Sequence, residues 1–125
     1  MTLYHFCPEH LLGSIKKVGL TLGMLPLIIN GECRISAGCQ WLTKNKSFTQ
    51  SWDTESTLPY KRNAYCITIK IPKDDKKLFN WLEFSNIPLM KETAATLNAY
   101  GDPQNWFIYL GNIKNIWFRD IVKND

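Results

Sequence analysis

A histidine between aromatic residues, in the stretch "LYHFC" at residues 3–7, is the first side chain suited to chemistry. An imidazole can donate or accept a hydrogen bond, and its charge changes near neutral pH. Leu3–Phe6 has the composition of a short strand, which would hold the His5 ring in a fixed direction. The rest of the chain must explain why such a ring stands there.

The other residues able to do chemistry form no closed motif. The four cysteines, Cys7, Cys33, Cys39 and Cys66, include no C-x-x-C pair, and no base that could activate a thiol lies beside them in sequence. A zinc site built from His5, Cys7, His10 and a later cysteine is conceivable, but the spacing matches no closed zinc motif. On the helix that follows the first strand, His10 fits a solvated face.

The composition predicts one folded domain spanning residues 1–125. Hydrophobic residues make up 45% of the chain, with five Trp, five Tyr and six Phe, which is enough apolar area for a packed core. The net charge of +4 is mildly basic, which allows an anionic partner such as a nucleotide without indicating a dedicated DNA-binding protein.

The sequence also predicts a compartment. No signal peptide is recognisable, and the longest apolar stretch, Gly23–Ile29, is too short to span a bilayer. Together with the unpaired cysteine pattern, this predicts a reduced, cytoplasmic protein that does not enter a membrane.

Strands and helices are expected to mix in an α+β domain. After the first strand, Pro8 suits the first turn of a helix whose apolar face is Leu11, Leu12, Ile15 and Val18, with Gly19 ending it. Further strands are expected at Cys39–Thr43 and Ala64–Pro72, where side chains alternate. Two closing strands are expected at Asn105–Gly111 and Asn115–Val122, joined through Gly111-Asn112.

The remaining segments are expected as loops and helices. Residues 21–37 are expected as a loop with an Asn-Gly turn signal, and residues 44–63 as a long polar loop in which Phe48 and Trp52 could anchor a short helix. Helices are expected at Lys73–Phe84, capped by Asp74 or Asp75, and at Ile87–Gly101.

This order of elements resembles the ADP-ribosyltransferase-like superfamily, in particular the DNA-targeting ADP-ribosyltransferase toxins and the RNA 2′-phosphotransferases. The opening "LYHFCPEHLLGSIKKVGL" resembles their first strand with Tyr-His and the helix that ends in Gly-Leu. "CQWLT", "KRNAYCITIKIP" and the closing "NWFIYLGNIKNIWF" resemble their second motif strand, a core strand and a closing hairpin. The resemblance implies a split β-sandwich whose cleft holds NAD or a related nucleotide such as ADP-ribose.

The resemblance also implies roles for individual residues. His5 would hydrogen-bond a ribose hydroxyl, while Tyr4 and Phe6 face the other way into the core. Trp41 or Thr43, on one face of their strand, would stack on nicotinamide or hydrogen-bond it. Arg62 would meet a phosphate, although it equally fits a solvated charge at a strand end. The cofactor-binding candidates are Tyr4, His5, Trp41, Thr43, Arg62, Gln104 and Trp106, and the catalytic candidates are His5 and Thr43.

One departure bears on catalysis. Transferases of this superfamily carry a Glu near the start of the closing strand, and here that place falls on "PQNWF", with Trp106 in the register. Asp102 is the nearest acid and lies earlier, in an expected turn. Gln104 could bind a ribose hydroxyl but cannot act as a base.

Three functions remain in competition. The first is a small NAD-dependent ADP-ribosyltransferase of phage or mobile-element origin, modifying a host protein or nucleic acid. The second is an inactive nucleotide- or protein-binding module, an inhibitor or sensor that keeps the fold without the catalytic Glu. The third is an RNA end processor, which is the weakest because the three arginines lie far apart in sequence.

Overall fold

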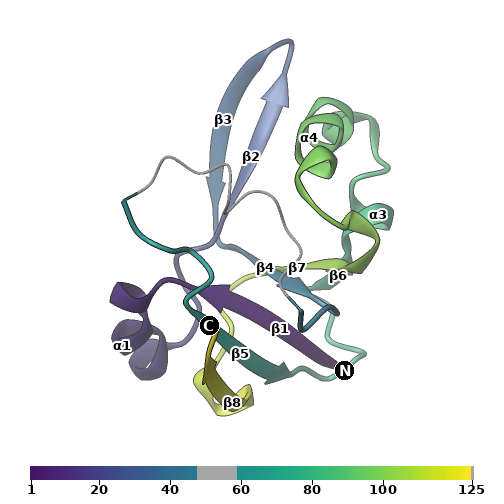
Figure 1. Ribbon diagram of the computed structural model, residues 1–125. Helices are drawn as coiled ribbons and strands as arrows, with labels where there is room; N and C mark the ends of the chain where they lie inside the picture. The colour runs from purple at the N-terminus through teal and green to yellow at the C-terminus, as the bar shows by residue number, and fades with distance from the viewer. Residues whose placement is uncertain (48–58, 125) are drawn as a thin grey trace.

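The computed structural model describes residues 1–47 and 59–124, and it shows an α+β fold built on a six-stranded antiparallel sheet (Figure 1). The strand order is β6-β7-β4-β1-β5-β8, and a separate two-stranded hairpin joins β2 to β3. The strands are β1 (Thr2–Cys7), β2 (Met24–Ile29), β3 (Glu32–Ala37), β4 (Cys39–Thr43), β5 (Tyr65–Lys70), β6 (Leu78–Asn80), β7 (Trp106–Leu110) and β8 (Phe118–Lys123).

Short helices cover the sheet. They are α1 (Glu9–Val18), α3 (Trp81–Phe84) and α4 (Lys91–Leu97), with 3₁₀ turns at Pro88–Met90, Asn98–Tyr100, Pro103–Asn105 and Asn115–Trp117. None of the helices in the described part of the chain is long and apolar enough to cross a membrane.

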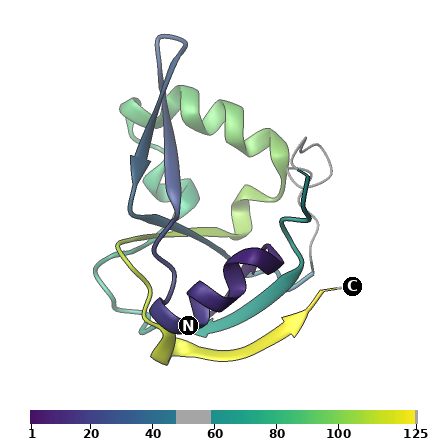
Figure 2. The ribbon, with the colours of Figure 1, turned by 90° about the vertical axis from the view of Figure 1, so that its left-hand side faces the viewer.

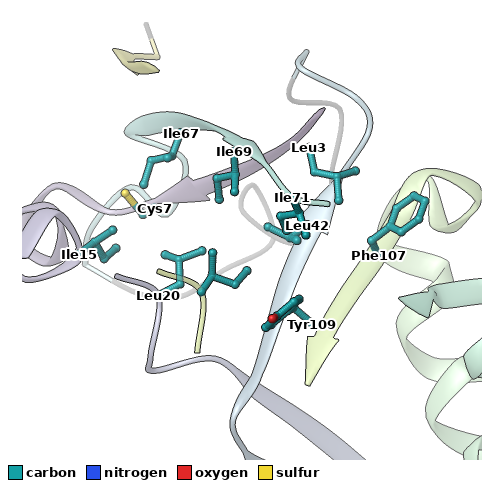
Figure 3. Close-up of a cluster of buried hydrophobic side chains, with 11 residues drawn as sticks. Leu3, Cys7, Ile15, Leu20, Leu42, Ile67, Ile69, Ile71, Phe107 and Tyr109 are labelled. Carbon is teal, nitrogen blue, oxygen red and sulfur yellow. The ribbon is translucent and has the colours of Figure 1, made fainter. Parts of the chain in front are cut away.

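The side chains of β7 divide between two cores, which shows how the layers are arranged. Phe107 and Tyr109 belong to a cluster that packs with α1 and the inner strands, whereas Trp106 and Ile108 belong to a second cluster with Trp81 of α3. Because neighbouring residues of a strand face opposite sides, α1 covers one face of the sheet and α3 and α4 cover the other. Figure 3 shows the first cluster.

The first helix and the strands β4 and β5 were predicted correctly. The helix α1 ends at Gly19, whose φ of 85° is left-handed and whose N–H donates to the Ile15 carbonyl. Of its expected apolar face, Ile15 is buried, whereas Val18 is 53% exposed and does not join the core. The strands at Cys39–Thr43 and Tyr65–Lys70 and a helix within Ile87–Gly101 are confirmed.

The first strand presents a different face to the core than expected. Leu3 and Cys7 are buried in the first cluster, whereas Tyr4 and Phe6 are only half-buried. The ammonium of Lys46 lies 6.0 Å from the centre of the Tyr4 ring. The expectation that Tyr4 and Phe6 point into the core was therefore wrong, because α1 packs on the face that carries Leu3 and Cys7.

The expected loop at residues 21–37 is instead the β2–β3 hairpin. Asn30 and Gly31 form its turn with φ values of 52° and 79°, as a two-residue type I′ turn requires. The run "MLPLII" shows no alternation of apolar and polar residues and contains Pro26, so the sequence did not predict a strand there. Proline is tolerated in β2 because its position on that strand requires no ladder N–H.

Two further expectations were wrong. Residues 73–77 form turns, and the expected helix is reduced to β6 and α3, whose cap is Asn80 instead of Asp74 or Asp75. The closing strands form no hairpin: β7 lies between β6 and β4, and β8 lies at the opposite edge. The linking segment instead pairs Ile113 with Leu20 through two backbone hydrogen bonds. The expected helix around Phe48 and Trp52 lies outside the described residues.

Candidate functional site

A cavity of about 790 Å³ lies where β1 and β4 part. These two strands share a single residue pair, Tyr4 with Thr43, whereas β1 pairs with β5 along its whole length. The walls of the cavity come from β1, α1, the segment 19–26, β4 and the segment 60–62. Leu97, Tyr100 and Trp106 complete the lining. The volume is in the range of small-molecule sites.

His5 holds the two parting strands together. Its Nδ1 lies 2.8 Å from the Trp41 carbonyl oxygen, which stands where a ladder bond would otherwise be. Since a carbonyl only accepts, Nδ1 carries the proton and Nε2 is the acceptor that the ring retains. Burial lowers the pKa of His5 below its ordinary value of 6.5, and the bond to Trp41 opposes this only in part. The ring is thus neutral at pH 7.

Thr43 stands at the point of parting, between β1 and β7. It pairs with Tyr4 on one side and Trp106 on the other, and its side chain is 7% exposed. Its Oγ1 accepts a hydrogen bond of 3.0 Å from the Asn45 N–H, so the hydroxyl proton can still be donated elsewhere.

An aromatic wall stands beside these two residues. The Trp41 ring lies 4.8 Å from Trp81 and 5.8 Å from Trp106, measured between ring centres. Its Nε1 donates to the Met24 carbonyl at 2.8 Å, which fixes the orientation of the indole. Trp41 and Trp106 line the cavity, and Trp81 packs against both of them from the core.

Gln40 is a cavity residue that the sequence reasoning missed. It is 1% exposed, and its Oε1 accepts a hydrogen bond of 2.9 Å from the Gly23 N–H. That bond fixes the amide, because Nε2 cannot accept, and Nε2 has no partner among the described residues. A buried amide donor without an acceptor is costly. The available signal was a glutamine between buried positions of a strand.

The structure brings together all but one of the residues expected at the site. Tyr4, His5, Trp41, Thr43, Arg62 and Trp106 line the cavity. Gln104 does not: it is exposed in the 3₁₀ turn Pro103–Asn105. Met24 and Pro26 were missed because their strand was taken for a loop.

The cavity is short of acids. Among the described residues that line it, none is Asp or Glu, and the one arginine is Arg62. Asp102, the nearest acid to the expected position, instead accepts hydrogen bonds from the side-chain amides of Asn45 and Asn105, at 3.0 and 2.9 Å. It therefore ties the end of β4 to the start of β7.

The described residues at the cavity offer neither a metal-binding cluster nor a reactive thiolate. In the part of the chain that the structure describes, no group of three His, Cys, Asp or Glu side chains could hold a metal ion. Cys7 lines the cavity, but burial raises its pKa to about 11, so that it is a thiol rather than a thiolate at neutral pH.

Comparison with protein families, with curated protein sequences and with solved structures finds no match to this chain.

Proposed function

We propose that this chain is an ADP-ribosyltransferase-like protein that holds NAD or ADP-ribose in the cavity between β1 and β4. The observation that carries the proposal is the convergence of Tyr4, His5, Trp41, Thr43 and Arg62 on one cavity, although they come from three separate segments. The parting of β1 from β4 supports it too, because a split β-sandwich opens its cleft between two strands in this way.

The lining of the cavity suits the parts of such a nucleotide. The indoles of Trp41 and Trp106 offer apolar surface to a planar base. The Nε2 of His5 can accept a hydrogen bond from a ribose hydroxyl, and the hydroxyl of Thr43 can donate one. Arg62 supplies the positive charge that a diphosphate requires.

The same lining favours binding over NAD cleavage. Trp106 stands at the start of β7, where the transferases of the superfamily carry their Glu, and it is only 8% exposed. No carboxylate of the described residues faces the cavity. A developing oxocarbenium ion would thus lack its stabilising charge. We therefore propose an inhibitor or sensor that binds the nucleotide and acts on a macromolecular partner, protein or nucleic acid.

Thermal shift and nicotinamide release, measured together, test the proposal. NAD or ADP-ribose at 100 times its dissociation constant stabilises a fold by about 2.7 kcal/mol. We expect this shift without release of nicotinamide above background. Release above background that disappears in His5→Asn would instead establish the transferase. The exposed control Gln104→Ala should have the same melting temperature as the wild type. Absence of a shift with both nucleotides would refute nucleotide binding.

A further inference from the structure

Gln40 of β4 places a buried hydrogen-bond donor in the wall of the cavity. The residue is 1% exposed, and its Oε1 accepts a hydrogen bond of 2.9 Å from the Gly23 N–H. Its Nε2 has no partner among the described residues. A buried donor without an acceptor destabilises a fold, and such an exception to full pairing calls for an explanation. A ligand in the cavity that brings its own acceptor provides one.

The amide is held at the edge of β4 from which β1 has parted. The two strands share one residue pair, and the segment at Gly23 meets the remaining edge of β4 instead. The N–H groups of Gly38 and Cys39 both donate to the Gly23 carbonyl, at 3.1 and 3.3 Å. This segment leads from α1 into the β2–β3 hairpin, which stands out from the rest of the molecule in Figure 2. The bond from the Gly23 N–H therefore fixes the Gln40 amide beside the opening between the two strands.

The orientation of the amide determines which chemical groups it can recognise. Because a backbone N–H only donates, the atom that faces Gly23 is Oε1, and Nε2 can only donate. Oε1 also keeps a second lone pair, so the amide can pair with a group that carries an acceptor beside a donor. A glutamine pairs in this way with the N7 and N6 atoms of adenine. The carboxamide of nicotinamide presents the same combination, a carbonyl oxygen beside an amino group.

The aromatic part of the lining selects bases less strictly. The indoles of Trp41 and Trp106 suit any planar base, because every base has a face that stacks. Selection among bases must therefore come from contacts with their edges. Among the described residues that line the cavity, Gln40 is the one carboxamide, and its orientation is fixed.

We propose that Gln40 selects the base of the bound nucleotide, with Nε2 donating to an acceptor on the edge of that base. The inference rests on the proposed function, because it needs NAD or ADP-ribose in this cavity. The chemistry that it assigns is an acceptor beside a donor on a planar ring. The nicotinamide carboxamide and the adenine edge both carry this chemistry. Comparison of NAD with ADP-ribose distinguishes them, since ADP-ribose has no nicotinamide.

Calorimetric titration of both nucleotides into the wild type, Gln40→Glu and Gln40→Met tests the role of Gln40. Glutamate keeps an oxygen for the Gly23 N–H but removes the donor, and methionine, of similar length, removes both groups. We expect each variant to bind at least about tenfold more weakly, as for the loss of one hydrogen bond. A loss for NAD alone assigns the contact to nicotinamide, and a loss for both nucleotides assigns it to adenine. Gln104→Glu, the same change at an exposed position, should bind like the wild type.

The titrations separate two kinds of failure. A wild type that binds neither nucleotide would overturn the nucleotide site, and this inference with it. A wild type that binds a nucleotide which both Gln40 variants bind equally well would overturn the role of Gln40 alone.

The side-chain amide of Gln40 gives a second readout in the wild type itself, which does not depend on whether a variant folds. In isotope-labelled protein, its Nε2 proton resonances should move downfield at saturating NAD, because Nε2 gains an acceptor. The exposed Gln104 amide is the control, and its resonances should stay in place. Gln40 amide resonances that do not move at saturation would contradict the proposal.

Discussion

At the scale of single residues, the opening histidine has two roles to fill with its two ring nitrogens. Nδ1 closes a gap in the sheet by bonding the Trp41 carbonyl, and only Nε2 is left for a ligand. Asparagine can place an amide N–H where Nδ1 lies while offering nothing in place of Nε2. His5→Asn thus separates the two roles, which His5→Ala would remove together.

The lowered pKa of His5 predicts a pH dependence of stability. Because burial lowers the pKa of His5, the unfolded chain binds a proton near pH 6.5 that the folded chain does not. As far as His5 is concerned, the free energy of unfolding should be constant above pH 6.5. It should decrease as the pH falls below 6.5, by at most about 1.4 kcal/mol per pH unit. Urea denaturation at several pH values measures this. His5→Asn should reduce the dependence of the free energy of unfolding on pH, whereas His10→Asn, at an exposed position, should leave it unchanged. The same pH dependence in the wild type and in both variants would contradict this role of His5.

Arg62 is predicted to recognise the phosphates of the nucleotide. Arg62→Ala should weaken ADP-ribose binding about ten- to hundredfold, as expected for loss of a charge-assisted hydrogen bond. Binding of adenosine, which has no phosphate, should stay within about twofold of the wild type. Equilibrium titrations with both ligands measure the contrast. An equal loss for adenosine and ADP-ribose would show that Arg62 supports the fold instead.

At the scale of elements, the segment before β2 packs closely on β4 at Gly23, beside the cavity. A Cβ at Gly23 would lie 2.2 Å from the Cys39 carbonyl oxygen and 2.4 Å from the Gln40 Oε1. Gly23→Ala should therefore destabilise the protein by about 1–3 kcal/mol and disturb the Gln40 amide.

Gly13 provides the matched control. It lies in α1 with no neighbour within 4 Å of an added Cβ, so Gly13→Ala should stabilise the helix by about 0.5–1 kcal/mol. Chemical denaturation of the two variants gives both signs. A neutral Gly23→Ala would mean that the segment before β2 does not pack on β4 as described.

Elements whose signal is local could be predicted from the sequence. Tyr65–Lys70 alternates and is a strand, and Pro8 and Gly19 bound α1. The strands β2 and β6 could not, because β2 is an unbroken apolar run with Pro26 and β6 is only the three residues Leu78–Asn80, too short to show a strand period. The pairing of β7 with β4 rather than β8 depends on contacts distant in sequence, such as that of Ile113 with Leu20.

The same division applies to the site. His5, Trp41 and Thr43 were predicted to lie together because each stands on a recognisable strand, and the structure places all three at one cavity between β1 and β4. Gln40 could not be assigned, because only the fold shows that it is buried and that its Nε2 lacks a partner. Gln104 was placed near the cavity by position in sequence, but the turn before β7 directs it to the surface.

At the scale of the whole molecule, the cavity and the open edge of β3 lie in different parts of the fold. The cavity lies within the body of the domain, where β1 and β4 part, and the open β3 edge lies on the projecting hairpin. Met24 and Pro26 of the hairpin also line the cavity. The hairpin therefore supplies part of the cavity wall and also carries an open strand edge.

The most direct test of the account is a calorimetric titration of ADP-ribose into the wild type, His5→Asn and Gln104→Ala. The account predicts saturable binding at one site in the wild type and in Gln104→Ala, and a loss of about tenfold or more in His5→Asn with its fold intact. Binding that is equal in all three proteins, or no heat in the wild type, would contradict a nucleotide site between β1 and β4.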